Sequence, residues 1–371
     1  MSEENRNIKI IISGGGTGGH LFPAIAIANA LRRIEPGVKI LFVGAEGKME
    51  MQKVPDAGYE IVGLPVAGLV RGGSIRNIYV AWKLFRSMLR AGQIIRKFAP
   101  DAVVGVGGYA SGPVLKQAQQ RKIPTLIQEQ NSYAGVTNKL LAKKAERICV
   151  AYEGMEKYFP KEKIMLTGNP VRQAYDSLAS LRGEALKHFS LEPGMPVVLV
   201  LGGSLGAGTV NNSVGGGIGL IETSGVQMIW QTGSHYYDRM RDMAETQGVT
   251  RIRVTGFINR MDLAYAAADV IISRAGAGTI SELALVGKPV ILVPSPNVAE
   301  DHQTHNAMAL VNRGAALLVR DADAQNELVK TALELVNDAS KRDSLSENIR
   351  KMAIRDADEI IAREVLKMIR R

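Results

Sequence analysis

The sequence predicts an α/β protein with two domains, each a doubly wound parallel sheet. Apolar strand patterns alternate with helical patterns along the whole chain, which is typical of parallel sheets covered by helices on both faces. A strand, a glycine-rich loop and a helix open the chain, and the same arrangement returns near its middle. With 371 residues, the chain is long enough to bury two cores.

Each domain is predicted to begin with this unit of strand, glycine loop and helix. In the first domain the unit is residues 8–12, the loop Gly14-Gly-Gly-Thr-Gly-Gly-His20 and a helix from Pro23 to Arg33. In the second it is residues 197–201, the loop Gly202-Gly-Ser-Leu-Gly-Ala207 and a helix from about Thr209. Further strands are expected at 39–43, 102–106, 125–128, 148–150, 227–231, 251–255, 270–273 and 290–293.

The boundary between the domains is predicted in the turn-rich segment 168–172. The first domain then covers residues 1–171 and the second covers residues 172–349. The last amphipathic run, Asp358 to Arg371, is expected to cross back, so that about residues 350–371 complete the first domain.

Composition indicates a globular protein of a reducing compartment. Hydrophobic residues make up 46% of the chain, and mean hydropathy is close to zero. The longest uncharged stretch, 196–221, is rich in glycine, which argues against a membrane span, and residues 1–7 lack the features of a signal peptide. Cys149 is the single cysteine, so no intrachain disulfide is possible and a cytoplasmic location is expected.

The segment from Ser273 to Leu283 carries the strongest functional pattern. A buried strand leads into Gly276 and Gly278, and a helix is predicted to start at Thr279 with Glu282 in its first turn. Free N–H groups at such a helix start bind phosphate, and the carboxylate suits a ribose diol. A second strand delivers the polar cluster Asp301-His-Gln-Thr-His-Asn306 to the same edge. Together these motifs resemble the donor-binding signature of the GT-B glycosyltransferases.

The first glycine loop permits two other interpretations, and neither fits well. Gly14-x-Gly-x-x-Gly19 matches the dinucleotide fingerprint, but no acidic residue ends the second predicted strand. A Walker A loop is excluded because His20-Leu21 stands where Lys-Ser/Thr is required. What remains is a backbone nest for a pyrophosphate, with His20 at its lip. A histidine held at a helix N-terminus beside such a loop is a candidate general base, with Glu129 as the next candidate.

Seven motifs together resemble the MurG family, over about residues 8–315. They are Gly14–His20, Gly107-Gly-Tyr-Ala-Ser-Gly-Pro113, Gln128-Glu-Gln-Asn131, Gly168-Asn-Pro-Val-Arg172, Gly202–Ala207, Thr255-Gly-Phe257 and the segment that begins at Ser273. The resemblance implies a GT-B fold, two Rossmann-like domains facing across a cleft. It also implies inverting transfer of GlcNAc from UDP-GlcNAc to the 4-hydroxyl of MurNAc in lipid I, which gives lipid II for peptidoglycan. The expected location is the cytoplasmic face of the bacterial membrane, as a peripheral protein without a cofactor.

The resemblance also implies a role for each motif residue. The first domain is expected to bind the acceptor and the membrane, and the second to bind the donor. Expected donor contacts are Thr17, Gly18, Gly19, Asn131, Arg172, Ser204, Ile258, Ala277, Gly278, Thr279, Glu282 and Gln303. Expected acceptor contacts are Gly15, Gly16, Gly107, Gly108, Tyr109 and Ser111. Among the donor contacts, Arg172 and Ser204 are assigned to the diphosphate, and the backbone of Ile258 is assigned to the uracil.

A metal site is not expected. His302 and His305 lie three residues apart beside Asp301, but no fourth ligand is evident, so a polar sugar-binding turn is favoured. Asp321-Ala-Asp323 and Asp356-Ala-Asp358 spell the Asp-x-Asp of metal-dependent glycosyltransferases, but neither follows a phosphate loop. The first is interpreted as a helix cap, and the second lies near the start of the last helix.

The net charge of +10 is concentrated in the first domain, and one segment carries much of it. Residues 61–100 contain no acidic residue, and a helix is predicted there. On this helix one apolar stripe is flanked by cations: Ile78, Trp82, Phe85 and Leu89, with Lys83, Arg86 and Arg90. An ordinary buried helix explains this pattern, as does a helix lying on an anionic membrane surface, and we favour the membrane.

Three rival functions remain open at this point. Another enzyme that uses UDP-sugars, such as an epimerase or a glycolipid synthase, fits the same fold. The basic surface suits nucleic acid, but no nucleic-acid-binding motif accompanies it, so nucleic acid is not an expected partner. A dinucleotide oxidoreductase is the third rival.

Overall fold

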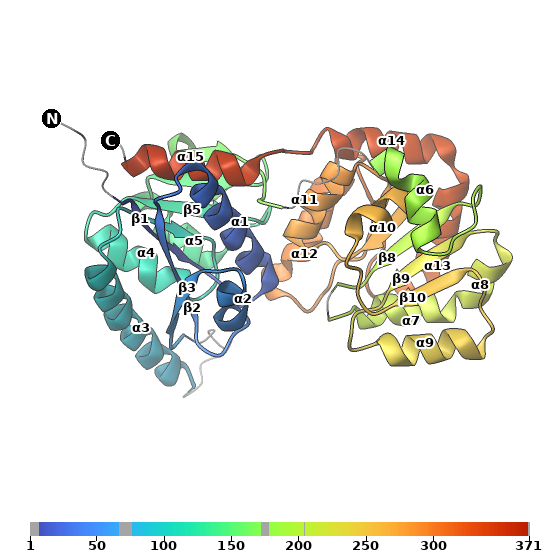
Figure 1. Cartoon of the computed structure of the whole chain (residues 1–371), viewed down its shortest axis with the longest axis horizontal. Coiled ribbons are helices and arrows are strands. Elements are labelled where there is room, and N and C mark those ends of the chain that lie inside the picture. Colours follow the sequence, from blue (N-terminus) through green and yellow to red (C-terminus); the bar gives the residue numbers. More distant parts are fainter. Residues whose placement is uncertain (1–6, 67–75, 172–177, 204, 370–371) are drawn as a thin grey trace. The chain divides into compact units, whose positions relative to one another are not determined.

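The chain forms two compact units. The computed structural model describes residues 7–66, 76–171, 178–203 and 205–369, without the side chains of residues 76–81 and 299. Contacts divide the chain into Met1–Val171 with Asp356–Arg371, and Arg172–Arg355 (Figure 1). This boundary falls inside the segment 168–172.

The first unit is a sheet of seven parallel strands in the order β3-β2-β1-β4-β5-β6-β7. The strands are β1 (Lys9–Ser13), β2 (Lys39–Ala45), β3 (Glu60–Leu64), β4 (Ala102–Gly105), β5 (Thr125–Glu129), β6 (Arg147–Val150) and β7 (Ile164–Leu166). The helices are α1 (Gly18–Ile34), α2 (Glu50–Asp56), α3 (Arg76–Phe98), α4 (Ser111–Gln120), α5 (Val136–Leu141) and α15 (Ala357–Ile369). Short 3₁₀ helices are η1 (Ala142–Lys144), η2 (Met155–Lys157) and η3 (Lys161–Lys163).

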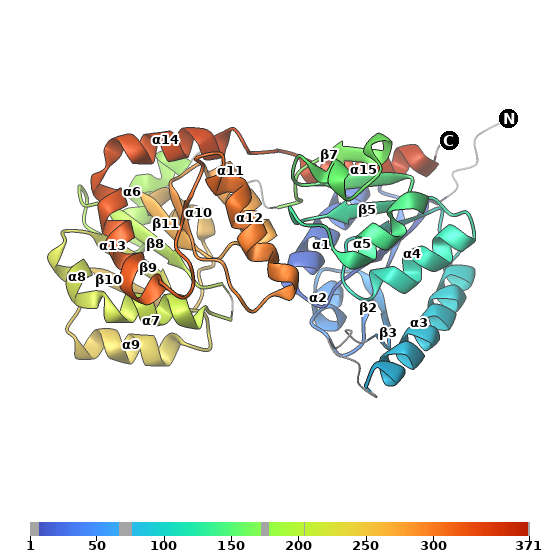
Figure 2. The same ribbon diagram turned by 180° about the vertical axis from the view of Figure 1, so that it is seen from behind.

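Helices cover both faces of this sheet, as a doubly wound fold requires. Ile10 and Ile12 of β1 point into a core shared with α1 and α15, whereas Ile11 points into the opposite core, which α3 and α4 close. This alternation follows from the two-residue period of a strand. Figure 1 shows α1 and α15 on the near face, and Figure 2 brings α4 and α5 forward.

The second unit repeats the plan with six parallel strands in the order β10-β9-β8-β11-β12-β13. The strands are β8 (Val197–Leu201), β9 (Gln227–Gln231), β10 (Ile252–Thr255), β11 (Val270–Ser273), β12 (Val290–Leu292) and β13 (Leu317–Leu318). The helices are α6 (Leu178–His188), α7 (Gly208–Gly216), α8 (Ile218–Thr223), α9 (Tyr237–Thr246), α10 (Met261–Ala267), α11 (Ala277–Val286), η4 (Ala299–Asp301), α12 (His302–Val311), α13 (Ala324–Asn337) and α14 (Ala339–Arg350). The predicted pair of doubly wound parallel sheets is therefore confirmed.

The start of α1 differs from the prediction. Pro23 was expected in the first turn, where its missing N–H costs nothing, but α1 begins five residues earlier and Pro23 lies inside it. The carbonyl of Thr17 accepts the N–H groups of His20 and Leu21, and this closes the first turn. His20 is therefore the third residue of the helix, at its N-terminal end. Among the described helices, none combines the length and the apolar sequence that a membrane span requires.

Cys149 is buried in a way that should slow its reaction with thiol reagents. Its side chain is fully buried in the core beneath α15, and burial, assisted by the carboxylate of Glu364, raises the pKa of the thiol to about 12. We expect the native protein at pH 8 to react with a thiol reagent roughly 10³-fold more slowly than the urea-unfolded chain. The reaction is followed with a thiol reagent that releases a coloured thiolate, whose absorbance is measured over time. Rapid modification of the folded protein would contradict the predicted burial.

Candidate active site

Two glycine loops meet at the carboxyl edge of the first sheet. They follow β1 and β4, which are neighbours at the point where the strand order reverses, and ligands bind at such points in doubly wound sheets. A Cβ atom on Gly108 would overlap the carbonyl oxygen of Gly15, and one on Gly14 would lie 2.9 Å from the carbonyl oxygen of Gly107. Gly15, Gly107 and Gly108 all have positive φ. Glycine is thus required on both sides of this contact.

The first loop is held from inside by a carboxylate. The N–H of Gly16 donates to both oxygens of Glu50, at 3.0 and 3.1 Å, and the N–H of Ala45 donates to Oε1 at 3.0 Å. Glu50 is 1% exposed. The prediction that this loop offers its N–H groups to a pyrophosphate is therefore wrong for Gly16, since a carboxylate of the chain already takes that N–H. No sequence pattern pointed to Glu50.

His20 lies beside both loops. Its Nδ1 is 3.1 Å from Oγ1 of Thr17, and a Cβ on Gly107 would lie 2.8 Å from its Cδ2 and 2.9 Å from its Nε2. When the ring proton is on Nδ1, this nitrogen donates to Thr17 and Nε2 is left as the basic nitrogen. The imidazole is thus oriented by the first loop and lies against the second.

Tyr109 and Ser111 in the second loop differ in accessibility. Tyr109 is exposed, as its predicted acceptor contact needs. Ser111 is fully buried, and its Oγ donates to the carbonyl of Gly108 at 3.0 Å. The Ser111 hydroxyl therefore stabilises the loop from within, and the predicted contact of Ser111 with the acceptor stays a prediction.

Glu129 at the end of β5 serves as an anchor for the following loop. Its Oε1 accepts from the backbone N–H and Nδ2 of Asn131, and its Oε2 accepts from the N–H of Gly135 and from Nδ2 of Asn138. Burial raises the pKa of this carboxyl group. Because it is buried and both oxygens are occupied, Glu129 is poorly placed to act as the alternative base. Its contacts instead fix Asn131, the predicted donor contact.

Amide side chains close the remaining end of this edge. Nε2 of Gln128 donates to Oδ1 of Asn169, and Nδ2 of Asn169 donates to the carbonyl of Gln130, both at 3.0 Å. Nε2 of Gln130 donates to the carbonyl of Val106 at 2.8 Å. All three side chains are buried, so this network joins the loops after β4 and β5 to the segment before the unit boundary.

In the second unit, the predicted anion site has a helix start of the expected kind. Gly276 is the extended N-cap of α11, directly after β11, and Ala277, Gly278 and Thr279 form its first turn. The helix starts at Ala277 and not at Thr279, so Glu282 lies in the second turn, where it is half-buried. The expectation that Glu282 occupies the first turn is wrong, because Ala277 and Gly278 belong to the helix.

The polar cluster after β12 has an unusual backbone. Glu300 and Asp301 both have positive φ, and α12 begins directly afterwards, at His302. Oε1 of Gln303 accepts the N–H of Ser295 at 2.9 Å, which fixes this predicted sugar contact. Within the described part of the chain, no three His, Cys, Asp or Glu side chains are grouped so that they could hold a metal ion.

Asp321 joins three segments at this edge. It forms an ion pair with Arg274, which follows β11, and accepts from Oγ1 of Thr209 at 2.9 Å. Nη1 of Arg274 also donates to the carbonyl of Val293 at 3.0 Å. The N-cap of α13 is Asp323, whose side chain makes no capping hydrogen bond. The interpretation of Asp321-Ala-Asp323 as a cap is therefore right for the position of Asp323 but not for a side-chain hydrogen bond, and Asp321 instead links the start of α7 to the segment after β11.

Three of the predicted donor contacts cannot be compared with side-chain positions in the structure. Arg172 and Ser204 lie outside the described residues. Ile258, after β10, is buried, and its assigned contact uses only the backbone. The expected position of both domains around one cleft also stays a prediction.

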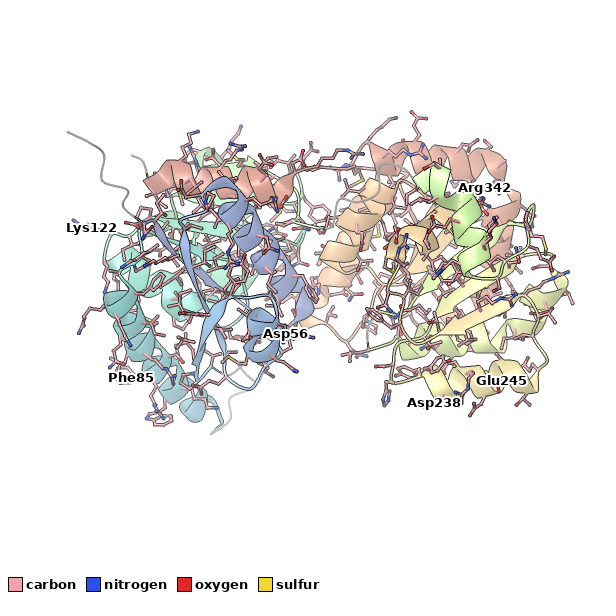
Figure 3. The ribbon with its side chains drawn as sticks, viewed as in Figure 1. Asp56, Phe85, Lys122, Asp238, Glu245 and Arg342 are labelled. Carbon is pink, nitrogen blue, oxygen red and sulfur yellow. The ribbon has the colours of Figure 1, made fainter. Side chains whose placement is uncertain are left out.

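The apolar stripe of α3 lies on the surface. Trp82, Phe85 and Leu89 are 51%, 62% and 55% exposed, and Figure 3 labels Phe85 on the outer side of this helix. The guanidinium of Arg86 lies 4.8 Å from the ring of Trp82. The core is contacted instead by Ala91 and Ile95. An ordinary buried helix is thus the wrong interpretation for these three residues, and the side chain of Ile78 is outside the described part.

Two doubly wound sheets with glycine loops at their carboxyl edges define the class as GT-B-type glycosyltransferases. The chain belongs to glycosyltransferase family 28. Residues 10–150 match the glycosyltransferase family 28 N-terminal domain, and residues 197–361 match the glycosyltransferase family 28 C-terminal domain.

Close relatives share the full length of the chain. One is the UDP-N-acetylglucosamine--N-acetylmuramyl-(pentapeptide) pyrophosphoryl-undecaprenol N-acetylglucosamine transferase of Bacteroides fragilis, 57% identical over 376 residues, with 99% of each chain covered. A protein of the same name from Flavobacterium psychrophilum is 51% identical, with 97% of this chain and 98% of the relative covered.

Solved structures agree on the fold. The crystal structure of Acinetobacter baumannii MurG has a TM-score of 0.79 at 27% identity and covers 97% of this chain, and 99% of that chain is matched. A UDP-GlcNAc 2-epimerase from Neisseria meningitidis, bound to UDP-GlcNAc, has a TM-score of 0.66 at 15% identity, with coverage of 97% and 100%. The epimerase likeness shows a shared fold alone.

Proposed function

We propose that this enzyme transfers GlcNAc from UDP-GlcNAc to the 4-hydroxyl of the MurNAc sugar in lipid I, with inversion, and so forms lipid II for peptidoglycan synthesis. The observation that carries the proposal is 57% identity over 99% of the chain to a relative named for this reaction. The arrangement of each sheet edge supports it, since one edge presents a helix N-terminus with a carboxylate and the other presents a histidine between two glycine loops.

The donor is assigned to the second unit. The N–H groups at the start of α11 suit the diphosphate, because the positive end of the helix dipole stabilises the charge that develops on leaving UDP. Glu282, one turn further, suits the ribose hydroxyls, and Gln303 suits the sugar. The ion pair of Arg274 with Asp321 supports the loops that carry these groups.

Glu282→Ala should weaken UDP-GlcNAc binding by about 1–3 kcal/mol, because the ribose hydroxyls lose a charged acceptor. Titration calorimetry with UDP and UDP-GlcNAc measures this. Glu245→Ala is the matched control, since Glu245 is an exposed glutamate on α9 of the same unit. Equal affinity of the Glu282 variant and the wild type would remove Glu282 from the donor site.

The acceptor and the catalytic base are assigned to the first unit. In the proposed step, the 4-hydroxyl oxygen forms a bond to the anomeric carbon while the bond from that carbon to the diphosphate breaks, and UDP leaves with the electron pair. Nε2 of His20 takes the hydroxyl proton, while Nδ1–H donates to Thr17 and holds the ring. The absence of a Cβ on Gly107 lets the second loop lie directly against the imidazole.

His20→Ala should lower kcat by about 10²–10⁴-fold and leave UDP-GlcNAc affinity nearly unchanged, because only the proton acceptor is lost. The acidic limb of the pH–rate profile should flatten as well, since no imidazole remains to be protonated. Steady-state kinetics with a short-chain lipid I analogue measures both effects. His188→Ala, at the end of α6, is a control that should keep wild-type kcat. A change confined to KM, with the pH profile preserved, would make His20 a binding residue.

We also propose that the protein lies at the cytoplasmic face of the bacterial membrane, with α3 in the anionic headgroup region. The exposed Trp82, Phe85 and Leu89 offer an apolar strip, and Lys83, Arg86 and Arg90 lie beside it in the sequence. Apolar side chains at this depth, together with cations, favour binding to an anionic bilayer. An acceptor held in the membrane by its lipid makes such a surface useful.

Changing Trp82 and Phe85 together to Ser should reduce sedimentation with anionic vesicles roughly 10- to 100-fold, because two large apolar contacts are lost. Turnover of a short-chain soluble acceptor should be unchanged. Leu220→Ser, an equally exposed position on α8 of the second unit, should bind vesicles like the wild type. Undiminished vesicle binding by the double variant would refute the membrane role of α3.

Thermal shift with three ligands separates this proposal from its rivals. Stabilisation by UDP, but not by NAD or by an oligonucleotide, is expected, because a ligand that binds the folded state raises its melting temperature. Stabilisation by NAD alone would favour an oxidoreductase, and stabilisation by the oligonucleotide alone would favour nucleic acid. Formation of UDP-ManNAc from UDP-GlcNAc, or of free ManNAc and UDP when water also cleaves the glycosyl phosphate, would indicate an epimerase.

A further inference from the structure

Glu50 is a buried carboxylate at the start of α2 for which the proposed reaction has no direct use. It is 1% exposed and accepts hydrogen bonds from the N–H groups of Gly16 and Ala45. We propose that Glu50 is a positioning residue, which sets the shape of the first glycine loop and thereby the place of His20. This inference rests on the proposed function.

The surrounding chain is shaped to admit this side chain. A Cβ on Gly15 would overlap Oε1 of Glu50, and a Cβ on Gly44 would lie 2.6 Å from its Cγ. Two segments far apart in sequence therefore lack a side chain where the carboxylate enters. A carboxylate oxygen can accept more than one hydrogen bond. The carboxylate of Glu50 therefore satisfies both backbone N–H groups that point toward it, those of Gly16 and Ala45. Its contacts join the ends of β1 and β2, which are paired strands.

The loop transmits this position to His20 by two routes. Thr17 directly follows Gly16, and its Oγ1 contacts Nδ1 of His20 at 3.1 Å. The other route runs through Gly15, whose carbonyl oxygen fixes how closely Gly108 approaches, and Gly107 lies against the imidazole. A shift of Gly15 and Gly16 therefore moves the hydroxyl that orients the ring and the backbone that supports it.

The geometry of the acceptor atom, and not its charge, carries the proposed role. Oε1 of Glu50 accepts from the N–H groups of both Gly16 and Ala45, each at 3.0 Å, whereas Oε2 accepts only from Gly16. A glutamine keeps one such oxygen, whereas alanine removes it and leaves two donors without their partner. Misplacement of a reacting group by about 1 Å can cost about 10²-fold in rate.

We therefore compare Glu50→Ala and Glu50→Gln with the wild type, using UDP-GlcNAc and a short-chain lipid I analogue. Glu50→Ala should lower kcat by about 10- to 100-fold while UDP affinity, measured by calorimetry, stays at the wild-type value. Glu50→Gln should restore most of the lost kcat. Amide hydrogen exchange at Gly16 and Ala45 should be faster in Glu50→Ala than in the wild type and close to wild type in Glu50→Gln, which tests the contact without activity.

Asp101→Ala is the matched control. Oδ2 of Asp101 accepts the N–H of Lys9 at 2.8 Å, at the amino end of β1, so the variant loses a carboxylate–backbone contact at the opposite edge of the same sheet. It should lose thermal stability but keep wild-type kcat. This separates loss of position at the active edge from general loss of stability.

Three results would overturn the inference: wild-type kcat in folded Glu50→Ala, equal loss of kcat in Glu50→Ala and Asp101→Ala, or a glutamine variant as inactive as the alanine variant. If Glu50→Ala fails to fold, the glutamine variant and its exchange rates decide. Failure of the proposed function is distinct, because the wild type itself would then transfer no GlcNAc to the lipid I analogue.

Discussion

The close approach of two backbones, at Gly15 and Gly108, is the constraint on which the first sheet edge depends. A parallel sheet brings the carboxyl ends of β1 and β4 side by side, but only residues without a Cβ let the following loops touch. The imidazole of His20 then lies against the second loop while it is oriented by the first. A Cβ on Gly108 would separate the loops, so the histidine would lose one of its two supports, whereas a Cβ on Gly15 would meet the side chain of Glu50.

Much of the fold was predictable because the central strands are buried on both faces. Three strands have the predicted bounds: 197–201, 227–231 and 270–273. A strand that is buried on both faces needs apolar residues at nearly every position, and this gives a continuous apolar run that is easy to recognise. The strands that were missed, β3, β7 and β13, lie at the edges of their sheets, and their partial exposure leaves only short or mixed patterns. The start of α1 was missed because Gly18 and Gly19 are weak helix formers, so local preference pointed to Pro23.

The site was predictable where its chemistry lies within one loop. The glycine loops, His20 and the start of α11 are local motifs. Glu50 and Asp321 are not, because each has a partner more than thirty residues away in the chain. Glu50 lies in no recognisable pattern, and the Asp-x-Asp at 321–323 does not point to the contacts that Asp321 makes. A helical wheel likewise shows which residues of α3 share a face, but it does not show which face packs against the sheet. In the structure the covered face carries Ala91 and Ile95, which leaves the large aromatic residues outside.

The path of the chain also governs how the protein is made. Ile361, Ala362 and Val365 of α15 complete the core that β1 and α1 share, yet all of the second unit precedes them in the sequence. During translation the first unit therefore cannot complete its core until the second unit has been synthesised, and the apolar face of α1 is uncovered until then. A ribosome that stalls within residues 172–355 leaves a nascent chain whose first sheet has all seven strands but lacks the cover of α15. Such a chain exposes apolar surface that α15 covers in the finished protein, and it is therefore prone to aggregation.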